Sequence, residues 1–382
     1  MKIVVSSTAL SGAVKTLSQV INKKNALPIL EEFHFEVAGK NLTITASDSE
    51  IWMQQTVELL ESDSDGKFCC SAQKLKDSLV GIIEQPVTLD AQVENSTIKV
   101  NHATGSTYFP ITSPLADEYP MPVQIEFKQE ASIIDSTEVI NAVSRCLWNI
   151  SSDELRPIMC GMCFDFDGDG LAIVGSDGLS ITSTEVFVEL DFKDSFILPK
   201  KAAQILSKLP KGIELQISFN TQWVDIEAGA IKLRARRING LYPKWRKVIP
   251  EMHECVYQAK LDRYALINIL HKVVPFTLQA DKAANIALDF KDEIKDRIHV
   301  KGEDFDLAQG ADDTMYIDEQ EGDPLVIGLS GNRLIHLLKS VNDSYVKMYF
   351  FGPTNAVIIK EADPDDKAPE ITMLVMPVLL ND

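Results

Sequence analysis

A helical pattern that recurs along the chain limits the folds available to this sequence. Residues 196–211 hold apolar side chains at the spacing i, i+3, i+4 and i+7, which places them on one face of a helix. They are Ala202, Ile205, Leu206 and Leu209. Related patterns occur in residues 68–83 and 325–341, and a second family of helical patterns precedes each copy. The copies are roughly 125–130 residues apart, close to the commonest size of a domain. The sequence therefore predicts three copies of one domain.

The face opposite these apolar residues is basic, with Lys200, Lys201, Lys208 and Lys211. Pro199 suits the first turn of the helix, where its missing N–H would have no partner, and Pro210 is predicted to end the helix. For one isolated helix, the simplest interpretation is a solvated lysine face. The return of the pattern in the other copies favours a functional surface instead.

The segments between the helices are predicted to be strands, because they alternate apolar and polar residues and are separated by turn residues. Each domain would then hold two helices packed on antiparallel sheets, an α+β fold. Tyr119-Pro120 and Tyr242-Pro243 occupy equivalent places near the ends of the first two copies. We expect domains at residues 1–125, 126–252 and 253–382. The clearest strand patterns are residues 42–48, 171–177, 216–219, 224–227, 231–236 and 345–350.

The net charge of −19 argues at first against a nucleic-acid partner. Its distribution favours one, because the expected helical segments together carry a net charge of +11, which leaves −30 for the rest of the chain. A basic stripe on an acidic body is typical of contact with phosphates without recognition of bases. The helical segments are residues 7–24, 71–83, 136–147, 200–211, 261–274 and 330–341.

The composition predicts a cytoplasmic protein. The start of the chain shows no secretory signal pattern, and no apolar run approaches the roughly 18 residues that a membrane span needs. Six cysteines in 382 residues do not indicate a disulfide framework, which fits a reducing compartment.

No catalytic or metal-binding arrangement is evident. Residues 165–170 copy the first half of a calcium loop, but Ser176 occupies its twelfth position, so a hairpin turn is the simpler interpretation. Cys160 and Cys163 have redox or zinc spacing, yet they lie in a strand-like run without a second pair, which favours buried apolar roles. The chain lacks a P-loop, a Gly-x-Ser-x-Gly elbow and an HExxH motif. We therefore predict a protein that is not an enzyme and needs no cofactor or metal.

Five short segments occur in a characteristic order and spacing along the threefold repeat. They are Met1–Ile3, Ala26–Leu30, Ser176–Gly178, Leu241–Pro250 and Val375–Val378. Over essentially the whole chain, they resemble the bacterial sliding clamp family, the β subunit of DNA polymerase III. The resemblance implies a head-to-tail homodimer, with six clamp domains in a ring and helices lining a hole for duplex DNA. Such a ring is a processivity factor of DNA replication, and it requires a heterologous contact that closes.

The resemblance also implies which residues serve DNA and the dimer contact. Phe109 and Ile111 of one subunit would meet the region of Val274 to Phe276 on the other. Lys24, Arg156, Lys200 and Lys201 would contact DNA. Pro157 and Ile158 occupy the place of an aromatic pair that touches DNA in relatives.

An apolar cleft between the second and third domains would receive short peptides. The implied partners are the replicative polymerase with its 3′–5′ exonuclease complex, the clamp loader and repair proteins. A methionine-rich apolar wall suits a pocket that takes several partners. For Ile181 and Val248, a plain core role is the alternative. The matching positions are Met159, Ser176, Gly178, Ile181, Pro243, Lys247, Val248, Ala356, Leu374, Met376, Pro377 and Val378.

Two departures from the family pattern lie at this cleft. Leu179-Ser180 replaces a usual His-Arg, and the chain ends in Leu379-Leu-Asn-Asp382 where relatives have Arg-Leu. We expect the cleft to persist with a different preferred peptide. The rival interpretations are an acidic repeat scaffold that binds no DNA, and an enzyme that uses Cys160 and Cys163 or calcium at Asp165.

Overall fold

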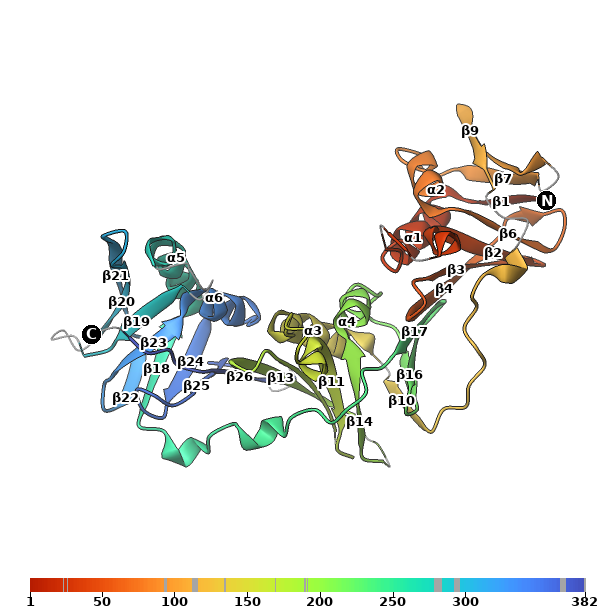
Figure 1. Cartoon of the computed structure of the whole chain (residues 1–382). Helices are drawn as coiled ribbons and strands as arrows, with labels where there is room; N and C mark the ends of the chain where they lie inside the picture. Colours follow the sequence, from red (N-terminus) through yellow and green to blue (C-terminus); the bar gives the residue numbers. More distant parts are fainter. Residues whose placement is uncertain are drawn as a thin grey trace. The chain divides into compact units, whose positions relative to one another are not determined.

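The structure, a computed structural model, divides into two compact units (Figure 1). Unit 1 comprises residues 1–136 and 208–237, and unit 2 comprises residues 137–207 and 238–382. None of the described helices is long and apolar enough to cross a membrane. The structure describes residues 1–22, 24–25, 27–92, 95–111, 116–133, 135–168, 170–188, 190, 192–277, 284–291, 296–364 and 369–380.

Unit 1 consists of two antiparallel sheets with helices α1 (Ser7–Leu17) and α2 (Ala72–Ser78) packed against them. The smaller sheet has the strand order β5-β1-β7-β8-β9, and the larger has the order β10-β15-β16-β17-β4-β3-β2-β6. The strands are β1 (Lys2–Ser6), β2 (Glu32–Ala38), β3 (Asn41–Ser47), β4 (Ile51–Glu58), β5 (Glu61–Ser62), β6 (Gly66–Ser71), β7 (Pro86–Gln92), β8 (Thr97–His102), β9 (Gly105–Pro110), β10 (Gln129–Ile133), β15 (Leu215–Phe219), β16 (Trp223–Ala228) and β17 (Ile231–Arg236).

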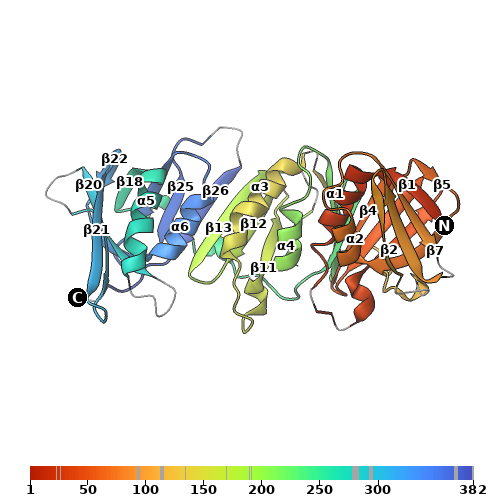
Figure 2. The same ribbon diagram turned by 90° about the horizontal axis from the view of Figure 1, so that it is seen from above.

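Unit 2 contains helices α3 (Ser136–Cys146, of which Ser136 belongs to unit 1), α4 (Lys200–Leu206), α5 (Arg263–Val273) and α6 (Gly331–Lys339). A nine-stranded sheet has the order β14-β11-β12-β13-β26-β25-β24-β18-β22, and a four-stranded sheet has the order β21-β20-β19-β23. Within this unit, the helices lie on one face of the larger sheet (Figure 2). The strands are β11 (Gly161–Phe166), β12 (Gly170–Ser176), β13 (Ser180–Phe187), β14 (Asp194–Pro199), β18 (Tyr257–Asp262), β19 (Asn285–Asp289), β20 (Arg297–Asp304), β21 (Gln309–Tyr316), β22 (Glu319–Gly322), β23 (Val326–Ser330), β24 (Tyr345–Phe350), β25 (Val357–Glu361) and β26 (Glu370–Val375).

Both large sheets continue across an expected domain boundary. In unit 1, β17 pairs with β4, with Leu233 opposite Met53. In unit 2, β13 pairs with β26, with Ile181 opposite Leu374. Backbone hydrogen bonds therefore join consecutive thirds of the chain, and the middle third contributes strands to each compact unit.

Polar caps at strand ends begin most of the helices. The side chains of Ser6, Ser71, Asp262 and Ser330 each accept a hydrogen bond from a backbone N–H of the first turn. A cap of this kind stabilises a helix by about 1 kcal/mol. Because each cap is the last residue of a strand, the same strand–cap–helix turn recurs at four places.

The strand predictions are confirmed, and three helices are shorter than predicted. Helix α1 ends at Leu17 instead of residue 24, α2 ends at Ser78 instead of residue 83, and α4 ends at Leu206 instead of residue 211. Pro199 occupies the N-cap of α4 and not its first turn. The helix ends at Leu206, so Pro210 does not terminate it. Ser207 follows the last turn, and its hydroxyl donates to the carbonyl of Gln204, 2.9 Å away. This local bond competes with continuation of the helix. As a result, Lys208 lies outside the helix.

The predicted hairpin at residues 165–170 is also confirmed. Strands β11 and β12 pair with Phe166 opposite Leu171, and the amide of Asp167 donates to the carbonyl of Gly170 at 3.2 Å. Gly168 adopts a φ of 96°, which favours glycine. Asp169 lies outside the described residues.

Candidate functional site

The turn between β12 and β13 is held by the carboxylate of Asp177. One oxygen accepts hydrogen bonds from the amides of Leu179 (2.9 Å) and Ser180 (2.7 Å), and the other accepts from Arg333 Nε on α6 at 3.1 Å. Burial alone raises the pKa of Asp177, but the Leu179 amide and the Arg333 guanidinium outweigh it and hold the pKa below its ordinary value. The turn is therefore tied to a helix 156 residues away in the chain.

Gly178 lets this turn pass close to the segment that precedes β11. Its φ is 86°, and a Cβ atom there would lie 2.7 Å from Arg156 Nη1 and 3.6 Å from Met159 Cε. The buried hydroxyl of Ser176 accepts from the Gly178 amide at 3.1 Å and donates to the Ser180 carbonyl at 3.0 Å. The structure thus brings Met159, Ser176 and Gly178 together.

A buried apolar cluster forms the base of this region. It contains three of the predicted residues, Ile181, Ala356 and Leu374, which come from three different strands or loops. Ile181 is therefore a core residue, in agreement with its simpler interpretation, and it faces Leu374 across the β13–β26 pair. The other members are Cys163, Ala172, Val174 and Trp245, with Tyr242 and Ile249 packed against them.

Above this base, apolar side chains are exposed to solvent. Met376, Leu179 and Val248 expose 37%, 49% and 50% of their surfaces. Val248 is thus not a core residue. The Met376 amide donates to the Leu179 carbonyl at 2.8 Å, which fixes the end of β26 beside the turn. Pro243 and Lys247 are also exposed, whereas Pro377 and Val378 are half-buried. An exposed apolar surface over a rigid base can bind the apolar side chains of a short peptide.

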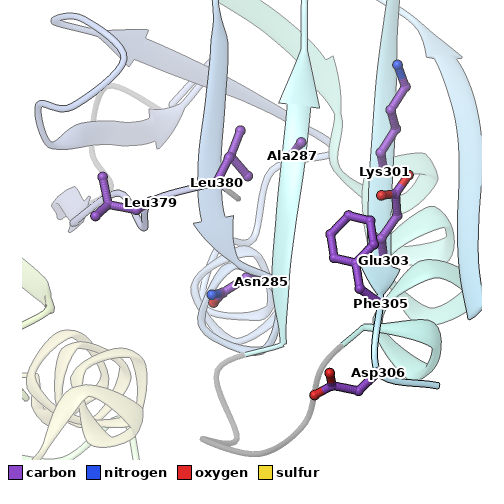
Figure 3. A pocket seen from close by; sticks show the side chains of 9 residues that line it. Asn285, Ala287, Lys301, Glu303, Phe305, Asp306, Leu379 and Leu380 are labelled. Carbon is purple, nitrogen blue, oxygen red and sulfur yellow. The ribbon is translucent and has the colours of Figure 1, made fainter. Parts of the chain in front are cut away.

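The C-terminal residues leave this region and attach to the four-stranded sheet. The Val378 amide donates to the Gly328 carbonyl at 2.9 Å, and Leu380 lies over Gly328. Leu379 and Leu380 line a separate cavity of about 270 Å³ together with Ala287, Lys301 and Phe305 (Figure 3). None of the residues predicted for the cleft lines this cavity. Asn381 and Asp382 lie outside the described residues.

The side chains that suggested an enzyme have structural partners. Arg246 contacts the carboxylates of Asp165 and Asp167 and lies over the ring of Trp245 at 4.3 Å. Cys163 is buried as predicted, but Cys160 is only half-buried in a 3-10 turn, Pro157–Cys160, and its thiol donates to the Asp153 carbonyl. Across the described residues, no group of three His, Cys, Asp or Glu side chains is placed to hold a metal ion.

The predicted DNA-contacting residues lie in different settings. Lys24 is exposed. Lys200 and Lys201, at the start of α4, are half-buried, and Lys200 Nζ donates to the Ile150 carbonyl at 3.0 Å. Arg156 is half-exposed and pairs with Asp153 at 2.8 Å. Its position beside Gly178 places it at the apolar surface described above.

Several other helical cations are committed to protein partners. Arg145 pairs with Glu361 at 3.5 Å, and Lys272 pairs with Asp313 at 2.8 Å. Arg263 is buried and donates to two backbone carbonyls. The basic surface is therefore smaller than the charge count of the helices implies. Within the described part of the chain, the exposed helical or helix-flanking lysines without a carboxylate partner are Lys15, Lys74, Lys76, Lys208 and Lys339.

The predicted dimer residues are mostly buried within the chain. Phe109 and Ile111 expose only 7% and 4% of their surfaces. Phe109 is thus already covered within its own chain, where it lies opposite Ile98 of β8. Val274 is buried against Gly331, whereas Phe276 exposes 45% of its surface. On β9, the exposed aromatic side chain is Tyr108.

Sequence reasoning missed the roles of Arg333, Tyr242 and Trp245 at the cleft. Arg333 lies in the expected helical segment 330–341, and no local pattern connects it with Asp177 because the two are distant in the chain. Tyr242 and Trp245 do belong to the Leu241–Pro250 segment. Two aromatic residues in a Pro-containing loop indicate that the loop packs its rings against the core, and this was the signal in the sequence for Tyr242 and Trp245.

Comparisons with known proteins agree over the whole chain. Residues 1–123 match the family description "DNA polymerase III beta subunit, N-terminal domain", and residues 133–244 match "DNA polymerase III beta subunit, central domain". A beta sliding clamp of Pseudomonas aeruginosa is 21% identical over 100% of both chains, and one of Synechococcus elongatus is 23% identical over 100% of both.

Solved structures share the fold at similar levels of identity. The sliding clamp (DNA polymerase III subunit beta) of Pseudomonas aeruginosa, bound to griselimycin, superposes with a TM-score of 0.89 at 18% identity, covering 100% of both chains. The DNA polymerase III beta subunit of Thermotoga maritima gives a TM-score of 0.87 at 20% identity, again covering 100% of both chains.

Proposed function

The chain belongs to the family of DNA polymerase III beta subunits, the beta sliding clamps, and from this premise we propose how it acts as the processivity factor of DNA replication. In the proposal, two copies close head to tail into a ring of six domains around duplex DNA. The three domains of each copy are residues 1–125, 126–252 and 253–382. The protein is not an enzyme, and the acidic scaffold without DNA is not favoured.

The observation that carries the proposal is the repeated strand pairing between consecutive thirds of the chain. Strand β4, the last of the meander β2-β3-β4, pairs with β17, the last of the meander β15-β16-β17. In the same way, β13 of the meander β11-β12-β13 pairs with β26 of the meander β24-β25-β26. The corresponding strands without such a partner are β9 in the first third and β21 in the last. In the described residues, β9 pairs only with β8, and β21 only with β20. Pairing of β9 with β21 of a second copy would repeat the same join and close the ring.

The side chains at these two edges support such a contact. Tyr108 on β9 and Tyr316 on β21 are exposed, as is Phe276 just after α5. Exposed aromatic side chains are enriched at protein interfaces. Phe109, Ile111 and Val274 would support this interface from within each copy, since they are buried beside it.

We propose that the apolar surface around Met376 is the cleft that receives partner peptides. Met159, Leu179, Val248 and Met376 would contact the peptide, with Ile181, Ala356 and Leu374 beneath them. The replicative polymerase, the clamp loader and repair proteins are the proposed partners. Leu179 stands where the family usually has a histidine, so we expect a more apolar peptide at this point of the rim. Ser176, Gly178, Pro243, Lys247, Pro377 and Val378 complete the proposed cleft.

Duplex DNA would be contacted through lysines, without recognition of its sequence. Lys24, Lys200 and Lys201 are the proposed contacts, and Arg156 would serve DNA or the cleft rim beside it. We place the protein in the cytoplasm, where bacterial DNA is replicated. Its six cysteines are unpaired, as suits a reducing compartment.

The oligomeric state tests the assembly most directly. Sedimentation of the purified protein should give a mass near twice that of the chain, 42.4 kDa. A protein that remains monomeric at micromolar concentration would contradict the ring. Retention on circular DNA then tests the function itself.

A further inference from the structure

An exposed tryptophan in unit 2 has no role in the proposed function. Trp148 lies in a 3-10 turn, Leu147–Asn149, that directly follows α3, and it exposes 64% of its surface. Its ring stacks on His336 of α6, with centroids 4.3 Å apart and planes inclined by 15°. The other tryptophans, Trp52, Trp223 and Trp245, are buried or half-buried.

The ends of the two helices lie close together beside the stack. The hydroxyl of Ser340, which caps α6, lies within hydrogen-bond distance of two acceptors: the His336 carbonyl of its own helix at 3.1 Å and the Arg145 carbonyl at the end of α3 at 3.2 Å. Arg145 is itself paired with Glu361. Since His336 covers one face of the Trp148 ring and most of the residue is exposed, the opposite face is open to solvent.

The elements that form this platform carry cations and no carboxylate. Helix α6 has Arg333, which is paired with Asp177, and Lys339 on its polar side, and burial lowers the pKa of His336 so that the imidazole is neutral at pH 7. Neither α4 nor the 3-10 turn contains an acidic residue. Lys339 is exposed one turn after His336. Lys200 Nζ lies 3.0 Å from the carbonyl of Ile150, two residues after Trp148. The neighbouring carboxylates of Glu361 and Asp153 are paired with arginines.

The fold does not require an aromatic pair at this position. In the first copy of the repeat, Gln19 occupies the place of Trp148, and in the second copy Gln204 occupies the place of His336. Since the matching positions elsewhere in the repeat hold glutamine, the helices form without this aromatic pair, and a ligand is the better explanation for an exposed indole among lysines.

We propose that the Trp148–His336 stack is a binding site for single-stranded nucleic acid, in which an unpaired base stacks on the open face of the indole. Lys339 and Lys200 would contact the flanking phosphates. Aromatic platforms beside cations are the usual means of binding single strands without sequence preference. The bases of a duplex are stacked on one another and do not present a face to the ring. The site therefore adds to the proposed function a preference for unpaired DNA near the clamp.

Binding of oligo(dT) by the full-length protein tests the site. Oligo(dT) should quench the tryptophan emission of the wild type, and this quenching should vanish in Trp148→Phe. Measured by anisotropy of a labelled oligonucleotide, Trp148→Ala should weaken binding by about 5- to 100-fold, while Trp148→Phe, which keeps a ring, should weaken it less. Lys339→Ala should weaken binding and lower its salt dependence by about one phosphate contact.

Two controls separate stacking from charge and from misfolding. Phe187→Ala removes another exposed aromatic side chain, far along β13, and should leave oligo(dT) binding unchanged. Heparin, a polyanion without bases, should bind wild type and Trp148→Ala equally. Equal oligo(dT) affinity for wild type and Trp148→Ala, or an equal loss for heparin, would overturn the site.

This inference rests on the proposed function but can fail separately from it. If the protein is retained on circular duplex DNA and Trp148→Ala still binds oligo(dT) normally, only the single-strand site is wrong. If oligo(dT) binding depends on Trp148 and circular DNA is not retained, the clamp proposal is wrong and the site stands.

Discussion

At the scale of single residues, Met376 offers the clearest test of the cleft. Its side chain is partly exposed and its backbone is fixed to Leu179, so Met376→Ala should leave folding intact. Truncation of an anchor residue at an interface commonly weakens binding by more than about 1–2 kcal/mol. Fluorescence titration with a polymerase C-terminal peptide measures this loss. Leu379→Ala is the matched control, because Leu379 lines the separate cavity. If Met376→Ala binds the peptide as the wild type does, the cleft lies elsewhere.

Asp177 links the cleft turn to α6, and its removal should have a pH-dependent cost. Its folded-state pKa lies below the ordinary value of 3.8, so the unfolded state binds more protons in the interval between the two. The stabilisation is therefore present above pH 3.8 and is lost as pH falls through the folded-state pKa. Hydrogen bonds to a charged group contribute about 1.5–3 kcal/mol.

Urea unfolding of Asp177→Asn, monitored by tryptophan emission, measures this effect. At pH 7 the variant should unfold at lower urea than the wild type, and the difference should shrink as pH falls below 3.8. Asp63→Asn is a matched control, since the Asp63 pKa is also lowered but the group is exposed in unit 1. A difference that persists unchanged in acid would show that Asp177 does not act through its charge.

At the scale of secondary-structure elements, the free edges β9 and β21 control assembly. Phe276→Asp places a charge at an exposed position next to this proposed interface and should shift the dimer toward monomer by more than about 2 kcal/mol. Sedimentation over a range of concentrations measures the shift. Phe187→Asp, at an even more exposed position outside the proposed interface, should have no effect. By contrast, Phe109→Asp should first destabilise unit 1, because Phe109 is buried there.

The elements themselves were predictable, and their partners only partly so. Alternation in the sequence located β3, β12 and β24. Only β24 alternates buried and half-buried residues throughout, whereas β12 is buried on both faces and β3 is buried on both faces over its second half. The end of α4 was misplaced because a serine side chain, not the nearby proline, closes its last turn. The burial of Phe109 within its own chain was not predicted. Burial depends on which strand lies alongside, and an alternating pattern does not specify the neighbouring strand.

At the scale of the whole molecule, the threefold repeat was predictable but the sharing of sheets was not. The pairing of β17 with β4 joins residues about 180 positions apart. Any strand with one apolar face could pair with β4 or with β17, so the sequence pattern does not select the partner. The cleft was predicted as a set of residues through the family resemblance. The ion pair between Asp177 and Arg333 joins residues from different thirds of the chain. It could therefore be found only in the structure.

The manner in which DNA is held is also a property of the whole molecule. Binding through phosphate contacts falls steeply with salt, because counterions are released. A closed ring instead holds DNA by topology, and its lysines need only keep the duplex away from the walls. Direct affinity should therefore be weak and salt-sensitive, whereas retention on a closed circle after loading should depend much less on salt. Lys200→Glu with Lys201→Glu should impair loading more than retention.

Co-elution with plasmid DNA at moderate salt, after loading by a clamp loader, distinguishes topological retention from binding through surface contacts. The protein should elute with the circular plasmid and separate from the same plasmid once it is cut, because a ring slides off a free end. The cut plasmid has the same length and sequence, so the comparison isolates topology from affinity. Equal elution with both forms would mean that surface contacts hold the DNA, and the ring would have to be abandoned.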